Sequence, residues 1–78
     1  MSSDHIKALE LARDGYWDES HQLVQASSDE LSCLIHAYLH REEGDMDNAT
    51  FWYKRADTTM PHNTLDEEWD RLYRLVSG

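Results

Sequence analysis

The sequence predicts an all-α protein of about five helices, arranged as two antiparallel helical hairpins and a C-terminal capping helix. Apolar residues recur at helical spacing through most of the 78 residues, and no segment alternates convincingly as a strand would. Glycine or proline stands at three of the four breaks in the periodicity, and two serines stand at the other. A chain this short has one small core, so we expect residues 1–78 to form a single domain.

The first hairpin is expected between residues 3 and 26. Its first helix runs from about Ser3 to Arg13, with one of the serines or the aspartate at residues 2–4 as its N-cap. Gly15 ends this helix, because glycine readily adopts the left-handed conformation that closes a helix C-terminus. A shorter helix follows from Tyr16 to about Ala26.

The third helix has the clearest apolar pattern in the chain. Ser27 and Glu30 have the spacing of a capping box, and a helix is expected from about Asp29 to Glu43. One face of it carries apolar side chains at i, i+3, i+4, i+7 and i+8, which are Leu31, Leu34, Ile35, Tyr38 and Leu39. This stripe predicts that the third helix packs into the core.

Two further helices complete the expected fold. Gly44 breaks the third helix, and Asp45 is the expected cap of a fourth helix from Met46 to about Thr58. Pro61 is a stop signal. The following string TLDE has capping-box spacing and opens a last helix from about Leu65 to Val76.

The composition is strongly acidic. Sixteen acidic residues against seven basic ones give a formal net charge of −9. This charge argues against nucleic acid and anionic membranes as partners, because both bind basic surfaces. Cys33 is the only cysteine, so no intrachain disulfide can form. No signal-peptide pattern or membrane-spanning apolar run is present. We therefore expect a cytoplasmic protein.

The chain contains a weak internal repeat. A shift of 29 residues places Gly15 on Gly44, and small residues fall on small residues where two helices would touch. The second copy resembles tetratricopeptide repeats, including their Sel-type variants, in a small–aromatic–alanine–proline series formed by Ala49, Tyr53, Ala56 and Pro61. The string HAYLHREEGDMDNATFWYKRA is also similar to one in short bacterial proteins. The resemblance implies a non-enzymatic module that presents a shallow groove to a protein or peptide.

The chain departs from the repeat pattern on the third helix. Cys33, His36 and His40 stand where such repeats usually have an aromatic residue, a leucine and a tyrosine. Together with Glu43 they form a polar line on one side of the helix, and His21 could join if the second helix packs alongside. Imidazole, thiolate and carboxylate groups are zinc ligands, so a small metal-binding protein or hydrolase is the alternative function.

Exposed aromatic residues are a second candidate surface. A domain of this size cannot hide all eight aromatic side chains, and those flanked by arginine are typical binding anchors. Phe51 and Arg55 make one such contact, although Phe51 could instead pack under the last helix. Candidate binding residues are therefore His21, His36, His40, Glu43, Trp52 and Arg55. We expect a protein or peptide partner, with a second copy of the chain as another alternative. We do not expect the protein to be an enzyme or to bind a cofactor.

Overall fold

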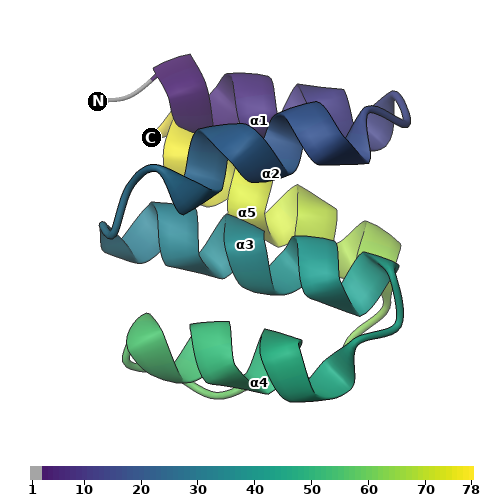
Figure 1. The fold of residues 1–78 in the computed structure, drawn as a ribbon, viewed down its shortest axis with the longest axis vertical. Coiled ribbons are helices and arrows are strands. Elements are labelled where there is room, and N and C mark those ends of the chain that lie inside the picture. The colour runs from purple at the N-terminus through teal and green to yellow at the C-terminus, as the bar shows by residue number, and fades with distance from the viewer. Residues whose placement is uncertain (1–2) are drawn as a thin grey trace.

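The computed structural model describes residues 3–78, which form five α-helices joined by short loops (Figure 1). The helices are α1 (Ser3–Arg13), α2 (Trp17–Gln25), α3 (Glu30–Glu42), α4 (Met46–Arg55) and α5 (Leu65–Ser77). These residues contain no strand, so the predicted all-α class and number of helices are confirmed. The largest error in a helix end is at α4, which was expected to reach Thr58.

Three helices end in the same hydrogen-bonded turn. After α1, α3 and α4, a residue with positive φ follows the helix, and the next N–H donates to the carbonyl five positions back. Gly15 and Gly44 occupy the first two of these turns, with φ of 90° and 85°. The two hairpin turns that the repeat aligns therefore have the same structure. Asp57, with φ of 62°, occupies the third turn and explains why α4 stops early.

The N-cap of α3 differs from the predicted one. Asp29 caps the helix by accepting a hydrogen bond of 3.0 Å from the Ser32 N–H. The hydroxyl of Ser27 donates to the Asp29 carboxylate instead of capping the helix itself. The expected capping box of Ser27 and Glu30 is therefore wrong, because α3 begins at Glu30 and Ser27 precedes the cap by two positions.

The caps of the two later helices are confirmed. Asp45 accepts from the Asn48 N–H at 3.2 Å at the start of α4. Thr64 and Glu67 form a reciprocal capping box on α5, with hydrogen bonds of 3.1 and 2.8 Å. Of the residues 2–4 that were expected to cap α1, residue 2 lies outside the described residues, and the other two belong to the helix itself.

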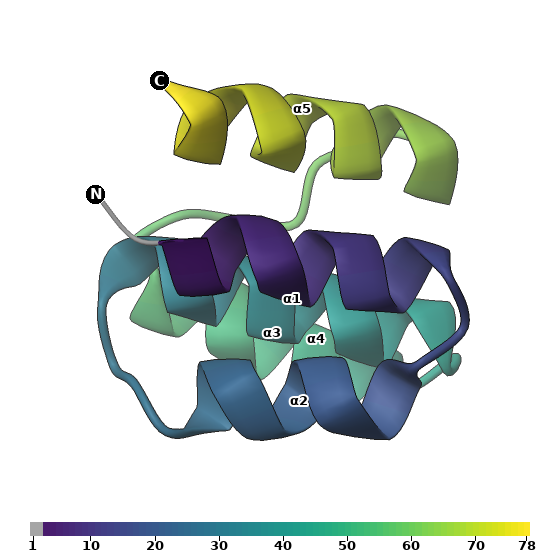
Figure 2. The ribbon, with the colours of Figure 1, turned by 90° about the horizontal axis from the view of Figure 1, so that it is seen from above.

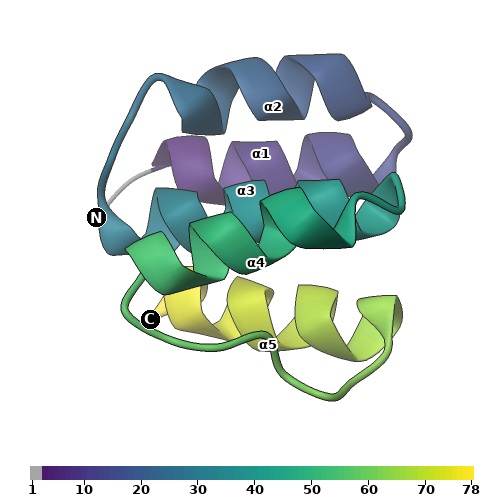
Figure 3. The same ribbon diagram turned by 60° about the horizontal axis from the view of Figure 1, so that its bottom comes forward.

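The helices are arranged around α3. The antiparallel pairs α1/α2 and α3/α4 form the two expected hairpins, and α3 contacts each of the other four helices (Figures 1 and 3). The last helix lies along α1 and α3 (Figure 2). It therefore covers the side shared by the first helices of both hairpins.

Burial of α3 is almost complete. Every residue from Ser32 to Arg41 is buried, including polar side chains on several sides of the helix. The surrounding helices contribute small and large apolar side chains to the same core, which are Ala8, Leu9, Ala12, Val24, Ala49, Tyr53, Ala56, Leu72 and Val76. An amphipathic stripe alone does not predict a helix that is enclosed on all sides.

A buried carboxylate joins α5 to α4. Glu68 is fully buried and accepts hydrogen bonds of 2.8 Å from the Tyr53 hydroxyl and 2.9 Å from the Asn63 amide. Arg71 adds two further bonds of 2.8 Å each. Burial alone would raise the pKa of Glu68, but these donors hold the pKa below its ordinary value. Arg41 extends the network by donating to Asn63 at 2.9 and 2.6 Å.

Replacing Glu68 by glutamine tests this network. The amide nitrogen would face donors that now meet a carboxylate oxygen, so we expect Glu68→Gln to lower the free energy of unfolding by about 2–4 kcal/mol. Asp70→Asn removes an exposed carboxylate from the same helix and serves as the control. Urea denaturation of both variants measures the difference. Equal stabilities of the two variants would show that the network adds nothing.

Candidate functional site

Three histidines from two helices meet beside α3. His21 lies on α2, and His36 and His40 lie one turn apart on α3. Their ring centroids are 4.5 Å apart for His21 and His36, 5.4 Å for His21 and His40, and 4.9 Å for His36 and His40. One ring nitrogen of each lies within 4.8 Å of those of the other two. The structure thus brings His36 and His40 of α3 together with His21 of α2, which the sequence analysis gave only as a possible third member.

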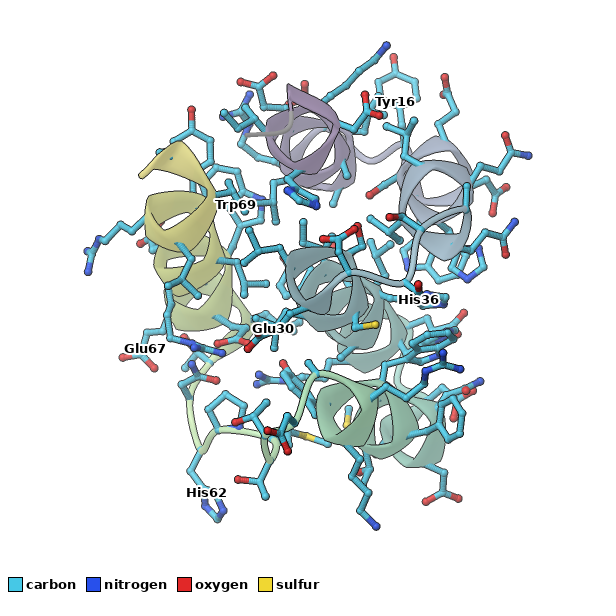
Figure 4. The ribbon with its side chains drawn as sticks, turned by 90° about the vertical axis from the view of Figure 1, so that its left-hand side faces the viewer. Tyr16, Glu30, His36, His62, Glu67 and Trp69 are labelled. Atoms are coloured by element: carbon cyan, nitrogen blue, oxygen red, sulfur yellow. The ribbon has the colours of Figure 1, made fainter. Side chains whose placement is uncertain are left out.

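His36 occupies the interior of this cluster. Its side chain lies on the side of α3 that faces α2 and α4 (Figure 4). Only 3% of the residue is exposed, and its Nδ1 is a buried polar atom without a hydrogen-bond partner. Leaving such an atom unpaired costs about 1–3 kcal/mol. Native structures contain few groups of this kind, and each of them requires an explanation.

The orientation of His40 is set by a carboxylate. Its Nδ1 lies 2.7 Å from Glu43 Oε2, one turn further along α3. The bond directs the opposite ring nitrogen, Nε2, away from the carboxylate. A carboxylate behind the imidazole is the usual second partner of histidines that bind metal ions, where it orients the ring and raises its basicity.

Two tryptophans form the walls of the cluster. The ring of Trp17 stacks on His21 at 4.8 Å, and its Nε1 donates to the Leu39 carbonyl at 2.8 Å. Trp52, from α4, stacks on His36 with 3.8 Å between ring centroids. These contacts hold two of the three imidazoles from the sides, so the cluster is a packed structure rather than a set of surface side chains.

Cys33 does not belong to the cluster. Its Sγ approaches the Ser28 carbonyl at 3.7 Å, and it is absent from the potential ligand groups among the described residues. The sequence placed it correctly on the same side of α3. Seven residues separate it from His40, however, which amounts to about 10 Å along a helix axis. Burial also raises the pKa of the thiol, which disfavours the thiolate that metals bind. Of the polar line on the third helix, His36 and His40 meet His21, Glu43 lies behind His40, and Cys33 stays apart.

The remaining predicted residues lie at the outer edge of the cluster. The guanidinium of Arg55 lies over the Trp52 ring at 5.1 Å and over the Phe51 ring at 5.9 Å. Phe51 is 51% exposed, so it does not pack under the last helix. Arg55 and Phe51 therefore extend the aromatic contacts of the cluster to the protein surface.

The neutral form is favoured for two of the three histidines, His21 and His36. Burial, together with smaller contributions from charges on His21, His40 and Arg55, lowers the pKa of His36 from 6.5 to about 4. Burial also lowers the pKa of His21, and the charge on His40 adds to this effect. A metal ion binds the neutral imidazole, so these two rings need not release a proton at neutral pH.

Sequence reasoning missed two polar clusters that lie elsewhere on α3. His5 Nε2 lies 2.8 Å from Asp29 and 3.1 Å from the Ser32 hydroxyl, which fixes α1 against the start of α3. Arg41 joins the network around Glu68 at the other end. A signal for the second cluster was present, because Glu68 falls within the apolar stripe of α5 between Leu65 and Leu72.

Comparisons with protein-family models, with curated proteins and with solved structures found no match to this chain. No helix among residues 3–78 has the length and apolar character needed to cross a membrane. The site is therefore interpreted from its own geometry.

The lowered pKa of His36 predicts a loss of stability in mild acid. His36 binds a proton more tightly in the unfolded chain than in the folded protein. Its full contribution to the free energy of unfolding is therefore present above pH 6.5 and is lost as the pH drops toward 4. Between about pH 7.5 and about pH 5 we expect the free energy of unfolding to fall by about 2 kcal/mol from this group. His21 adds to the loss in the same direction.

Variants identify the group responsible. His36→Phe keeps an aromatic ring beside Trp52 but removes the titrating nitrogen, so its unfolding free energy should depend less on pH. His62→Phe, at an exposed position, should retain the dependence of the unchanged protein. Urea denaturation at the two pH values measures both. A His36→Phe variant as pH-sensitive as the unchanged protein would contradict the assignment.

Proposed function

We propose that this protein binds one divalent transition-metal ion through His21, His36 and His40. The observation that carries the proposal is the buried His36 Nδ1, which has no hydrogen-bond partner and belongs to a ring packed against two further imidazoles. A metal ion satisfies a buried ring nitrogen that no donor or acceptor of the protein reaches. This reading was the alternative from sequence, and the geometry now favours it over a groove-binding module.

The chemistry of the ligands selects the class of ion. Three imidazoles suit zinc, copper, nickel or cobalt rather than calcium or magnesium, which bind oxygen. Glu43 would serve as the outer partner of His40 and not as a ligand, since its Oε2 is engaged by the ring. Three protein ligands leave at least one coordination position for water or another small ligand.

The surroundings of the cluster favour a binding role over catalysis. Cavities of about 520, 430 and 360 Å³ open elsewhere on the described residues, and none of the three histidines lines them. A bound ion would therefore have no substrate pocket among these cavities. It would instead connect α2, through His21, to the two histidines of α3. We infer that the ion stabilises the contact between the first and second hairpins.

Metal titration of untagged protein tests the proposal. We expect one zinc or cobalt ion per chain, and a gain in unfolding free energy of about 2.7 kcal/mol when free metal is at about 100 times the Kd. His21→Gln removes the ligand on α2 with the least disturbance of the core, since that residue is only half-buried. It should lose most of this gain, as should His36→Asn.

Two controls separate this site from other binding. Cys33→Ala and His62→Gln should bind metal as the unchanged protein does, because neither side chain reaches the cluster. Calorimetry gives the stoichiometry, and the visible spectrum of bound cobalt reports the ligands. Substoichiometric binding without stabilisation, or binding that disappears with Cys33, would refute the three-histidine site.

A second candidate function is protein binding through the outer edge of α4. Phe51 is exposed, and the Arg55 guanidinium above it has no hydrogen bond or ion pair among the described residues. An aromatic ring with an adjacent arginine has the composition of a binding anchor. Because α5 covers the side shared by α1 and α3, this edge is where a protein, a peptide or a second copy would bind.

A binding role for the α4 edge predicts that a substitution there changes partner binding but not the stability of the fold. Phe51→Ser should abolish partner capture or self-association while changing the unfolding free energy by less than about 0.5 kcal/mol. The Leu75→Ser variant removes a comparably exposed apolar side chain from α5 and is the control. Affinity capture and light scattering at several concentrations measure the two kinds of partner. Retained capture by Phe51→Ser would exclude this edge.

A further inference from the structure

A cavity of about 430 Å³ lies between α1, α3 and α5, on residues that the histidine cluster does not use. Three carboxylates, two aromatic rings and one arginine line it, contributed by Tyr38, Glu42, Asp66, Trp69, Asp70 and Arg13. None of the three carboxylates forms an ion pair or a side-chain hydrogen bond among the described residues. Each of these three residues is exposed, so a solvated acidic surface would explain the carboxylates alone.

Tyr38 is the buried side chain that lines this cavity. The residue is only 5% exposed, yet its hydroxyl has no hydrogen-bond partner among residues 3–78. It lines the cavity beside Glu42 and Asp66. Its oxygen is free to accept a hydrogen bond from a ligand in the cavity.

Trp69 makes the aromatic wall rigid. Its Nε1 donates to the Leu9 carbonyl at 2.8 Å, and its ring stacks on Tyr73 at 4.9 Å. The guanidinium of Arg13 already lies over the Trp69 ring at 5.5 Å. This contact demonstrates that the wall of the cavity accepts an organic cation. Arg13 also pairs with Asp14 outside the cavity, at 3.3 Å.

The spacing of the carboxylates favours an extended cation over a metal ion. Glu42, Asp66 and Asp70 are not among the groups of described residues whose ligand atoms lie close enough to share an ion. A metal needs its ligands around one point, whereas a linear amine carries charges along a chain. Its methylene groups would lie against the aromatic walls, as lysine stems do on apolar surfaces.

We propose that this cavity binds a linear alkylamine with two or more ammonium groups. The ammonium groups pair with Asp66, Asp70 and Glu42, and one of them donates to the Tyr38 hydroxyl. The net charge of −9 attracts such a cation from solution. The cavity lies between α1, α3 and α5, whereas His21 lies on α2. Binding of the amine does not depend on the proposed metal ion.

Calorimetric titration with spermidine and putrescine tests the proposal, with chelator present to keep metals out. We expect one spermidine per chain and weaker binding of n-butylamine, which carries a single charge. The double variant Asp66→Asn/Asp70→Asn should lose about tenfold in spermidine affinity. Its control, Asp47→Asn/Asp57→Asn, removes the same charge from exposed positions on and after α4 and should bind as before.

Two single variants test the site in other ways. One leaves the net charge unchanged, and the other should strengthen binding instead of weakening it. Tyr38→Phe keeps the net charge and the ring, and it should weaken spermidine binding several-fold once circular dichroism confirms folding. Arg13→Gln removes the competing cation and should strengthen binding more than Lys7→Gln, which changes the charge equally on another face. Equal affinities in the two double variants would identify general acidic attraction and overturn the site. Selective binding of lysine peptides over free polyamines would overturn the ligand class.

Discussion

The enclosure of α3 is the constraint on which the rest of this structure depends. The helix contacts all four others, and it is buried from Ser32 to Arg41. A helix in that position usually has apolar residues all around it. This one carries a serine, two histidines and an arginine, so each neighbouring helix has to supply partners for a polar group.

Two of the resulting polar clusters are satisfied by protein groups. At the start of α3, the Ser32 hydroxyl donates to Asp29, and both residues meet His5 of α1. At its end, Arg41 is held by Asn63, which in turn donates to Glu68 of α5. These clusters determine which helix lies on which side of α3, since each connects to a different neighbour. Between them, the cluster that faces α2 leaves the Nδ1 of His36 unpaired. Among residues 3–78, this nitrogen is the buried side-chain polar atom without a partner, and leaving it unpaired costs stability. This is the reason for proposing a functional site here.

Local rules predicted the helices well because each end has a local cause. The glycine turns, the Asp45 cap and the Thr64–Glu67 box depend on a few consecutive residues, and all of them were read correctly. The cap of α3 was misassigned because both Ser27 and Asp29 can accept backbone hydrogen bonds, and only the first helical residue decides between them. The side of α3 that carries the histidines was also predicted. Which of its residues meet was not, because periodicity gives the angle around a helix and not the position of a neighbouring side chain such as His21.

The place of α5 could not be predicted from repeat patterns. Its apolar stripe indicates a buried face but not which helices cover it. Glu68 decides the matter in the structure, because its carboxylate has to reach Tyr53, Asn63 and Arg71 together. The resulting position of α5 along α1 and α3 underlies our proposals of a protein-binding edge on α4 and of metal binding at the histidine cluster.

X-ray absorption at the zinc edge of the loaded protein tests the central claim most directly. It reports the atoms bound to the ion without reference to activity or a partner. The three-histidine centre predicts three imidazole nitrogens at about 2.0–2.1 Å, completed by light oxygen or nitrogen ligands, and no sulfur. The same nitrogen shell should lose one imidazole in His21→Gln. A sulfur shell at about 2.3 Å, or an oxygen-only shell unchanged in that variant, would contradict the claim that the unpaired His36 belongs to a metal centre.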